Sequence, residues 1–136
     1  MILVVDDHAD TCEALEHLFR RRGIEVRCAE SGSAAVEFLI RHTPRLILLD
    51  VMTPDMSGID LLKLIRSNRD FDATPVIMYS ADFQYERWDE AKRLGAQDYL
   101  VKGTIGFDAL LDRVQSWLPR ADLLSPGDLS PGQERS

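Results

Sequence analysis

The sequence predicts an α/β fold in which helices cover both faces of a doubly wound parallel sheet. Five short apolar runs alternate along the chain with segments whose apolar residues recur at helical spacing. The runs are apolar at nearly every position, which is expected for strands that are buried on both faces. Right-handed crossovers between such strands favour the strand order 2-1-3-4-5.

Residues that start or stop helices bound the elements. Gly23 and Gly95 follow helical segments, where a glycine readily takes the left-handed conformation that ends a helix. Ser31 is placed to cap the second helix, and Pro44 ends it. In order, the expected elements are strand 2–5, helix 9–22, strand 24–29, helix 33–41, strand 45–49, helix 59–67, strand 76–79, helix 84–94, strand 98–101 and helix 106–118. This is the flavodoxin-like (βα)5 arrangement.

Each helical segment has an apolar face that can pack on the sheet. In the first helix this face carries Cys12, Leu15 and Phe19, which lie at helical spacing. Cys28 alternates with apolar residues on the second strand, and neither cysteine has a metal-ligand spacing. Both cysteines are therefore expected to be free thiols in the core.

Length and composition indicate a single domain with one core. The chain has 136 residues, 45% of them hydrophobic, and a net charge of −7. The negative charge argues against binding of nucleic acid, which requires clustered lysines and arginines. No signal peptide or membrane span is visible, so we expect a cytoplasmic protein that does not contact membranes. The domain is expected to cover residues 1–118, and residues 119–136, rich in Pro, Gly and Ser, to be a flexible tail or linker stub with no second domain.

Carboxylates follow the first and third strands. Asp6 and Asp7 come after the first apolar run, and Asp50 comes after the third. Because strands 1 and 3 are neighbours in the expected order, these side chains meet at the carboxyl edge of the sheet, where open α/β sheets bind ligands. Packed carboxylates repel one another unless a cation intervenes, and an oxygen-only cluster with few protein ligands favours Mg²⁺. Such an ion also neutralises charge on a phosphoryl group.

A serine and a lysine follow the two remaining strands at this edge. Ser80 ends the fourth strand, and Lys102 follows the fifth. Lys102 would start roughly 10 Å from Asp50, a gap that only a long, flexible cation covers. The Ser80 hydroxyl can donate to a phosphoryl oxygen. With Asp50 as the nucleophile, the set fits covalent phosphoryl transfer to a carboxylate.

Taken together, these motifs resemble the response-regulator receiver domain of two-component signalling, in its stand-alone form. The resemblance covers residues 1–118. The segments that carry it are Val4-Val5-Asp6-Asp7, Leu48-Leu49-Asp50 with Pro54 and Gly58, Tyr79-Ser80-Ala81, and Gly95-Ala96-Gln97-Asp98-Tyr99-Leu100-Val101-Lys102.

The resemblance implies a phosphorylation-dependent switch that catalyses only its own phosphorylation and dephosphorylation and is not a turnover enzyme. Asp50 would accept a phosphoryl group from a histidine kinase or a histidine phosphotransfer protein. Asp7 and Asp50 would bind Mg²⁺ directly, Asp6 would bind it through water, and Met52 would contribute its backbone carbonyl.

The resemblance also implies how the switch would act. Ser80 and Lys102 would hold the phosphoryl oxygens, and Tyr99 would turn inward as Ser80 moves toward the phosphate. The face formed by the fourth helix, the fifth strand and the fifth helix would then control an effector protein that the sequence does not identify. Phosphorylation could also drive formation of a homodimer.

Some positions leave alternatives open. The family usually has proline after the lysine, whereas here Gly103 follows Lys102. Either that loop is trans and differently shaped, or it tolerates a cis bond, which costs ~2.5–4 kcal/mol without proline. Tyr99 is either the switch residue or ordinary core, and Trp88 is either a surface reporter or half-buried. Asp82 either orients water near the phosphoryl site or is simply exposed.

Two other functions would need residues that the chain lacks. An aspartyl-nucleophile phosphatase of the haloacid dehalogenase type has an acid two residues after its nucleophile, where Met52 stands here. A flavodoxin-like FMN binder needs Gly, Ser or Thr donors after the first strand, where the loop is Asp6-Asp7-His8-Ala9-Asp10. His8 is expected to be an exposed loop residue rather than a ligand or relay.

Overall fold

The structure, a computed structural model, describes residues 1–118, and the expectations for residues 119–136 lie outside them. The strands are β1 (Ile2–Val5), β2 (Val26–Ala29), β3 (Leu46–Leu49), β4 (Val76–Ser80) and β5 (Asp98–Val101). The helices are α1 (Ala9–Arg20), α2 (Gly32–Arg41), α3 (Gly58–Ser67), α4 (Tyr85–Arg93) and α5 (Phe107–Trp117), with a short 3-10 helix, η1 (Arg69–Phe71). The strands form one parallel sheet in the order β2-β1-β3-β4-β5, which confirms the predicted topology.

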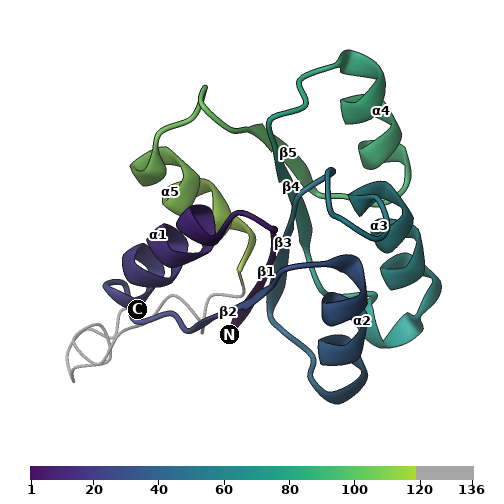
Figure 1. The fold of residues 1–136 in the computed structure, drawn as a ribbon, viewed down its shortest axis with the longest axis horizontal. Coiled ribbons are helices and arrows are strands. Elements are labelled where there is room, and N and C mark those ends of the chain that lie inside the picture. The colour runs from purple at the N-terminus through teal and green to yellow at the C-terminus, as the bar shows by residue number, and fades with distance from the viewer. Residues whose placement is uncertain (119–136) are drawn as a thin grey trace.

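The sheet is the middle of three layers. Helices α1 and α5 cover one face, and α2, α3 and α4 cover the other (Figure 1). The residues of β1, β3 and β4 are buried throughout, as their continuous apolar runs predict. Cys12 and Cys28 are free thiols in the layer between the sheet, α1 and α5, as expected.

Two helices end at the glycines that the sequence indicates. Gly23 has φ +78, and the Ile24 N–H donates to the Phe19 carbonyl at 2.9 Å, the bonding pattern of a Schellman motif. Gly95, with φ +108, closes α4 in the same way. Because Ile24 belongs to this helix-ending turn, β2 begins two residues later than expected, at Val26.

The segment from α3 to β4 contains η1, which the sequence did not indicate. The guanidinium of Arg66 links this segment to the residues just before β5 by donating hydrogen bonds to three backbone carbonyls and one side-chain oxygen. Its acceptors are Gly95 O at 3.0 Å, Phe71 O at 2.8 Å, Thr74 O at 2.8 Å and Gln97 Oε1 at 2.9 Å. Arg66 lies on α3 and reads in the sequence as an ordinary polar helix residue, so its role is visible only in three dimensions.

The strand register places the ends of β1 and β3 side by side. Val5 pairs with Leu49, and the Asp50 N–H donates to the Val5 carbonyl at 3.0 Å. Asp6 and Asp50 therefore both leave the sheet at its carboxyl edge. Within residues 1–118, no helix has the length and apolar character needed to span a bilayer.

Candidate functional site

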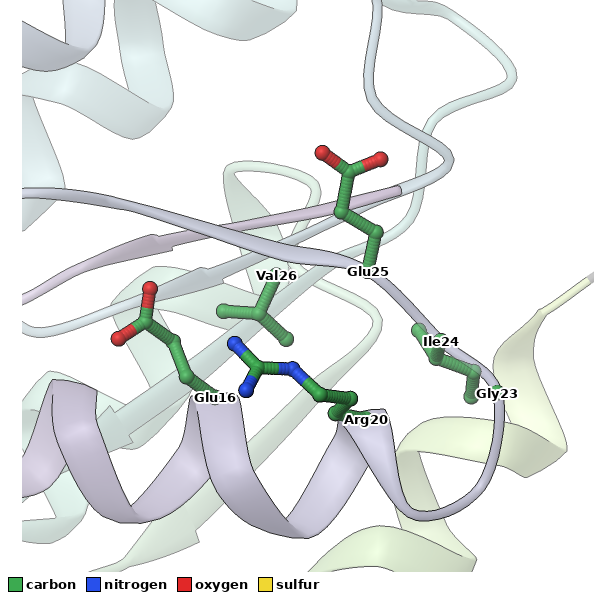
Figure 2. A pocket seen from close by; sticks show the side chains of 6 residues that line it. All are labelled: Glu16, Arg20, Gly23, Ile24, Glu25 and Val26. Carbon is green, nitrogen blue, oxygen red and sulfur yellow. The ribbon is translucent and has the colours of Figure 1, made fainter.

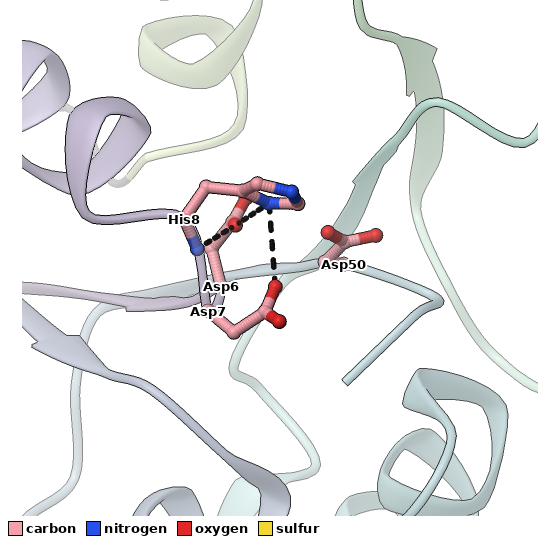
Figure 3. Close-up of side chains that lie close together, drawn as sticks. All are labelled: Asp6, Asp7, His8 and Asp50. Carbon is pink, nitrogen blue, oxygen red and sulfur yellow. Dashed lines mark hydrogen bonds and ion pairs between the residues drawn. The ribbon is translucent and has the colours of Figure 1, made fainter. Parts of the chain in front are cut away.

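Three carboxylates meet at the carboxyl edge of the sheet. Asp6 and Asp50 are 2% and 3% exposed, whereas the Asp7 side chain is 40% exposed. One ligand atom from each of these acids and from His8 can be chosen so that all lie within 4.8 Å of one another. Figure 3 shows the side chains of the loop after β1 beside the Asp50 carboxylate. The structure thus brings together acids that lie 43 or more residues apart in the sequence.

Lys102 reaches these acids from the far side of β4. Its Nζ lies 2.6 Å from Asp6 Oδ2 and 3.2 Å from Asp50 Oδ2. Burial alone would lower the pKa of Lys102, but the hydrogen bond to Asp6 and the charges of Asp50 and Asp6 outweigh it, so the pKa is raised. The ammonium therefore stays charged and partly neutralises the cluster.

The ring of Tyr79 also supports Lys102, a contact that the sequence did not indicate. Lys102 Nζ lies 5.5 Å from the centroid of this ring, within the range of a cation–π interaction. Tyr79 is buried on β4 and pairs in register with Leu100 of β5, two residues before Lys102. Its place in the strand order gave the only signal that it lies near the lysine.

The turn after β5 resolves the question that Gly103 raised. Gly103 has φ +87, and no cis peptide bond occurs among residues 1–118. Lys102 forms a bridge with Ile105, so the chain makes a tight turn directly after the lysine. The left-handed conformation favours glycine at this position. A trans loop of this shape still directs the lysine to the acids.

The loop after β3 holds Asp50 from its own backbone. The Met52 N–H donates to Asp50 Oδ1 at 3.1 Å, and the Gly58 N–H donates to the Val51 carbonyl at 2.7 Å. A Cβ on Gly58 would lie only 2.0 Å from the Asp50 carbonyl oxygen. Glycine at this position therefore lets the first turn of α3 pack against the backbone that carries Asp50.

A second acid of this loop, Asp55, accepts hydrogen bonds from the N-terminus of α2. Its carboxylate accepts from the Gly32 N–H at 2.8 Å and the Ser33 N–H at 2.9 Å, and the Ser33 hydroxyl bonds to it as well. These bonds lower the pKa of Asp55, the hydrogen bond from the Ser33 side chain most of all. The loop between Asp50 and α3 is thus held by the bond from Gly58 to Val51 and by the bonds of Asp55 to the start of α2. Together with Asp7, this loop lines an open groove of about 460 Å³.

Ser80 and Tyr99 lie beside the acids but are joined to a different loop. Ser80 is fully buried, and its Oγ accepts from the Asp82 N–H at 3.2 Å. Tyr99 is 6% exposed and donates its hydroxyl to the Asp82 carbonyl at 2.7 Å. Burial raises the pKa of Tyr99 to about 12, and the charge of Asp82 adds to the shift. In the described part of the chain, no hydrogen bond or ion pair joins Ser80 to the three acids.

The Asp82 side chain is engaged as well. Its carboxylate accepts from Arg87 Nε at 3.2 Å and from the Gln84 N–H at 3.0 Å, and it is 15% exposed. Of the two alternatives for Asp82, simple exposure is therefore wrong.

Trp88 is 39% exposed, with Tyr85 at 5.4 Å between ring centroids and Lys92 over its ring.

His8 contacts the acids, which sequence reasoning did not expect. It is exposed as predicted, with 64% of its side chain accessible. Its Nδ1 nevertheless lies 2.9 Å from Asp6 Oδ1 and 3.3 Å from Asp7 Oδ1. The hydrogen bond to Asp6 is the main reason that the pKa of His8 is raised. A histidine directly after two acids was the only signal for this contact.

The donor atoms at this edge fit a hard divalent cation. Carboxylate oxygens predominate, two of the acids are buried, and the third faces the groove, where water can complete a coordination shell. A separate hollow of about 330 Å³ lies between α1 and β2, lined by Glu16, Arg20, Gly23, Ile24, Glu25 and Val26 (Figure 2). Its lining lacks a clustered set of acids, so the carboxyl edge is the candidate site.

Comparison with known proteins agrees with this geometry. Residues 2–115 match the family model of the response regulator receiver domain. The transcriptional regulatory protein KdpE of Mycobacterium tuberculosis is 34% identical over 120 residues, which cover 88% of this chain and 51% of that protein. The transcriptional regulatory protein GltR of Pseudomonas aeruginosa is 38% identical over 125 residues, which cover 88% of this chain and 49% of that protein. The chain thus spans about half the length of these curated relatives.

Solved structures show the same fold. The receiver domain of the Francisella response regulator 1452 has a TM-score of 0.78 at 32% identity, covering 85% of this chain and 93% of that one. The chemotaxis response regulator CheY4 of Vibrio cholerae has a TM-score of 0.80 at 29% identity, covering 86% of this chain and 97% of that one. With the match to the family model over most of its length, the chain belongs to the response regulator receiver domain family of two-component signalling.

Proposed function

We propose that Asp50 accepts a phosphoryl group from a phosphohistidine of a histidine kinase or histidine phosphotransfer protein, in a Mg²⁺-dependent reaction. The observation that carries the proposal is the position of Lys102 Nζ, 3.2 Å from a buried Asp50 carboxylate and 2.6 Å from Asp6. A carboxylate that is enclosed, oriented and accompanied by a cation suits nucleophilic attack on phosphorus. The domain that carries this site is residues 1–118.

The transfer requires little covalent chemistry from the protein. An Asp50 oxygen forms the new P–O bond as the P–N bond of the donor breaks, and the departing imidazole keeps the bonding electron pair and takes a proton from solvent. Met52 N–H holds Asp50 Oδ1, and Lys102 places positive charge beside Oδ2. Positioning and charge neutralisation of this kind account for most catalysis of phosphoryl transfer. Asp6, Asp7, Asp50 and the Met52 carbonyl would hold Mg²⁺, which supplies neutralising charge for the phosphoryl oxygens.

The output would pass through the loop between β4 and α4. Ser80 holds the Asp82 N–H, and Tyr99 holds the carbonyl of the same residue. If the Ser80 hydroxyl turned to a phosphoryl oxygen, it would release the Asp82 N–H, and the contact with Tyr99 would change with it. The exposed ring of Phe83 lies in this loop and that of Tyr85 directly after it, at 75% and 67% exposure.

We place the effector surface on α4, β5 and α5, with these rings at the start of α4, and its partner is a protein or a second copy of this chain. Exposed aromatic rings favour contact with another protein surface. The net charge of −7 disfavours direct contact with nucleic acid. The domain acts as a switch and not as a turnover enzyme.

The first test uses acetyl phosphate as a small phosphoryl donor. Intact mass spectrometry of the wild type with acetyl phosphate and Mg²⁺ should show one added phosphoryl group that base removes. The adduct should be absent from Asp50→Asn and unchanged in Asp60→Asn, which removes an exposed aspartate on α3. An equal adduct on Asp50→Asn would overturn the proposal, and repeated turnover of phosphomonoesters would support a phosphatase instead.

A second measurement tests the output. Trp88 lies on α4 and Trp117 on α5, the helices before and after β5 in the chain, and each is 39% exposed, so tryptophan fluorescence reports on these helices. Beryllofluoride with Mg²⁺ should change the emission of the wild type and of Trp117→Phe, but not of Asp50→Asn. Emission that does not respond in any of these proteins would contradict a conformational change at α4. Sedimentation of the same samples tests for a homodimer.

A further inference from the structure

Local structure does not explain the presence of His8. It is the N-cap residue of α1, a position where Ser, Thr, Asp or Asn usually accepts a hydrogen bond from the first N–H groups of the helix. His8 makes no such capping bond. Although its ring is 64% exposed, Nδ1 is directed at the carboxylates of Asp6 and Asp7.

Once Nδ1 has lost the proton that it shares with Asp6, the spacing of these atoms allows them to become ligands of one metal ion. Ligand bonds of about 2.0–2.2 Å place neighbouring ligands of an octahedron about 3 Å apart and opposite ligands a little over 4 Å apart. His8 Nδ1 lies 2.9 Å from Asp6 Oδ1 and 3.3 Å from Asp7 Oδ1. The ring of His8 and the Asp7 carboxylate stand on the same side as Asp50 in Figure 3, and the four ligand atoms fall within 4.8 Å of one another.

Lys102 does not occupy the place of the imidazole. The two oxygens of Asp6 face different groups, with Lys102 Nζ at 2.6 Å from Oδ2 and His8 Nδ1 at 2.9 Å from Oδ1. The lysine approaches from β5, on the buried side, whereas His8 and Asp7 form the exposed side. An ion on the exposed side would therefore meet the nitrogen of His8 together with oxygens of Asp6 and Asp7.

We propose that His8 Nδ1 is a ligand of the metal site, and that it raises the affinity for a borderline first-row cation such as Co²⁺, relative to Mg²⁺, above what the carboxylates alone would give. This inference rests on the metal site of the proposed function. Mg²⁺ takes oxygen ligands, whereas imidazole suits the later first-row metals. Because carboxylates alone also bind Co²⁺ well, the diagnostic quantity is how far the Co²⁺ to Mg²⁺ affinity ratio falls when the nitrogen is removed.

Calorimetric titration with CoCl₂ and with MgCl₂ at about pH 8 tests this proposal, because a histidine binds a metal only as the neutral imidazole. His8→Ala should weaken Co²⁺ binding about tenfold or more, the loss seen for changes to the surroundings of metal ligands. Its Mg²⁺ affinity should change much less. The matched control is His17→Ala, which removes an exposed histidine of α1 and should leave both affinities unchanged.

The visible absorption of bound Co²⁺ gives a second readout, because it depends on the ligand set. The spectrum should change in His8→Ala and not in His17→Ala, with far-UV circular dichroism showing that both variants fold. Equal Co²⁺ affinity and equal spectra for wild type and His8→Ala would overturn the inference. In that case loss of Mg²⁺ binding in Asp50→Asn would still support the proposed site, whereas a wild type that binds neither ion would overturn both.

Discussion

Replacement of Gly58 by alanine tests how closely α3 approaches the acceptor strand. An added Cβ would lie 2.0 Å from the Asp50 carbonyl oxygen and 2.8 Å from the Asp50 carbonyl carbon. It would also lie 2.8 Å from Val51 Cα. Real Cβ atoms essentially never come within 3.0 Å of such neighbours, so the helix start or the acceptor backbone must move by about 1 Å. All three neighbours are backbone atoms, which cannot turn away as a flexible side chain can.

Two costs and one gain determine how far Gly58→Ala lowers the free energy of unfolding. Overpacking of a close contact costs about 1–3 kcal/mol. The movement also weakens the bond from the Gly58 N–H to the Val51 carbonyl, which is 2.7 Å long, and such a bond is worth about 1 kcal/mol. Alanine gains at most about 1 kcal/mol in helix propensity over glycine. The steric and hydrogen-bond costs exceed this gain, so Gly58→Ala should destabilise the fold by about 1–3 kcal/mol.

Urea denaturation followed by tryptophan fluorescence measures this loss, and acetyl phosphate labelling measures the effect on Asp50. Gly106→Ala is the matched control, because no heavy atom lies within 4 Å of a Cβ there and φ is −74. It should cost less than about 1 kcal/mol, the usual effect of alanine at an N-cap. A Gly58→Ala protein as stable as wild type and labelled at the same rate would show that α3 does not lie this close to Asp50.

Three further substitutions test contacts around the site. Arg66→Met removes the donors to four oxygens and should lower the free energy of unfolding by about 2 kcal/mol or more in urea denaturation, and Arg66→Lys should not restore it. Lys102→Met should lower the melting temperature without Mg²⁺, and Mg²⁺ should recover it by neutralising the same acids. The pKa of Lys102 is raised, so the stabilisation by its ammonium is fully present below about pH 10.4, the ordinary lysine pKa, and is lost as the pH rises through the folded-state pKa. The difference in melting temperature between wild type and Lys102→Met should therefore disappear at alkaline pH. Tyr99→Phe should cost about 0.5–1.5 kcal/mol in urea denaturation, since the Asp82 carbonyl loses its donor, and no change in stability would contradict the bond.

The sequence predicts the fold because local patterns locate the helices and strands, and the right-handed crossover rule then limits the strand order. Apolar runs locate the strands, Gly23 and Gly95 mark helix ends, and right-handed crossovers leave few strand orders. Once the order is known, the acids after β1 and β3 must meet, as the structure shows. The reach of Lys102 across β4 follows from the same order and from the length of its side chain.

Contacts between remote side chains and backbone atoms were not predictable in this way. Arg66 bonds carbonyls up to 29 residues away, and nothing in its own segment distinguishes it from a solvated arginine. The approach of Gly58 to Asp50 depends on how α3 docks, which local patterns do not specify. Tyr79 supports Lys102 through its ring, although its burial alone would mark it as core. These residues act through three-dimensional neighbours that periodicity does not encode.

Asp6 lies between Lys102 and the proposed metal ligands, so metal binding and the position of the lysine should affect each other. Its Oδ2 holds Lys102 at 2.6 Å, closer than the 3.2 Å between Lys102 and Asp50. A divalent cation at Oδ1 of Asp6 would reduce the negative charge that holds the ammonium at Oδ2, and Lys102 would then favour Asp50, the carboxylate proposed to carry the phosphoryl group. Metal binding would thereby prepare the lysine for the phosphoryl oxygens. Since such coupling is reciprocal, a phosphoryl group that draws Lys102 away from Asp6 would in turn strengthen the hold of the acids on the metal.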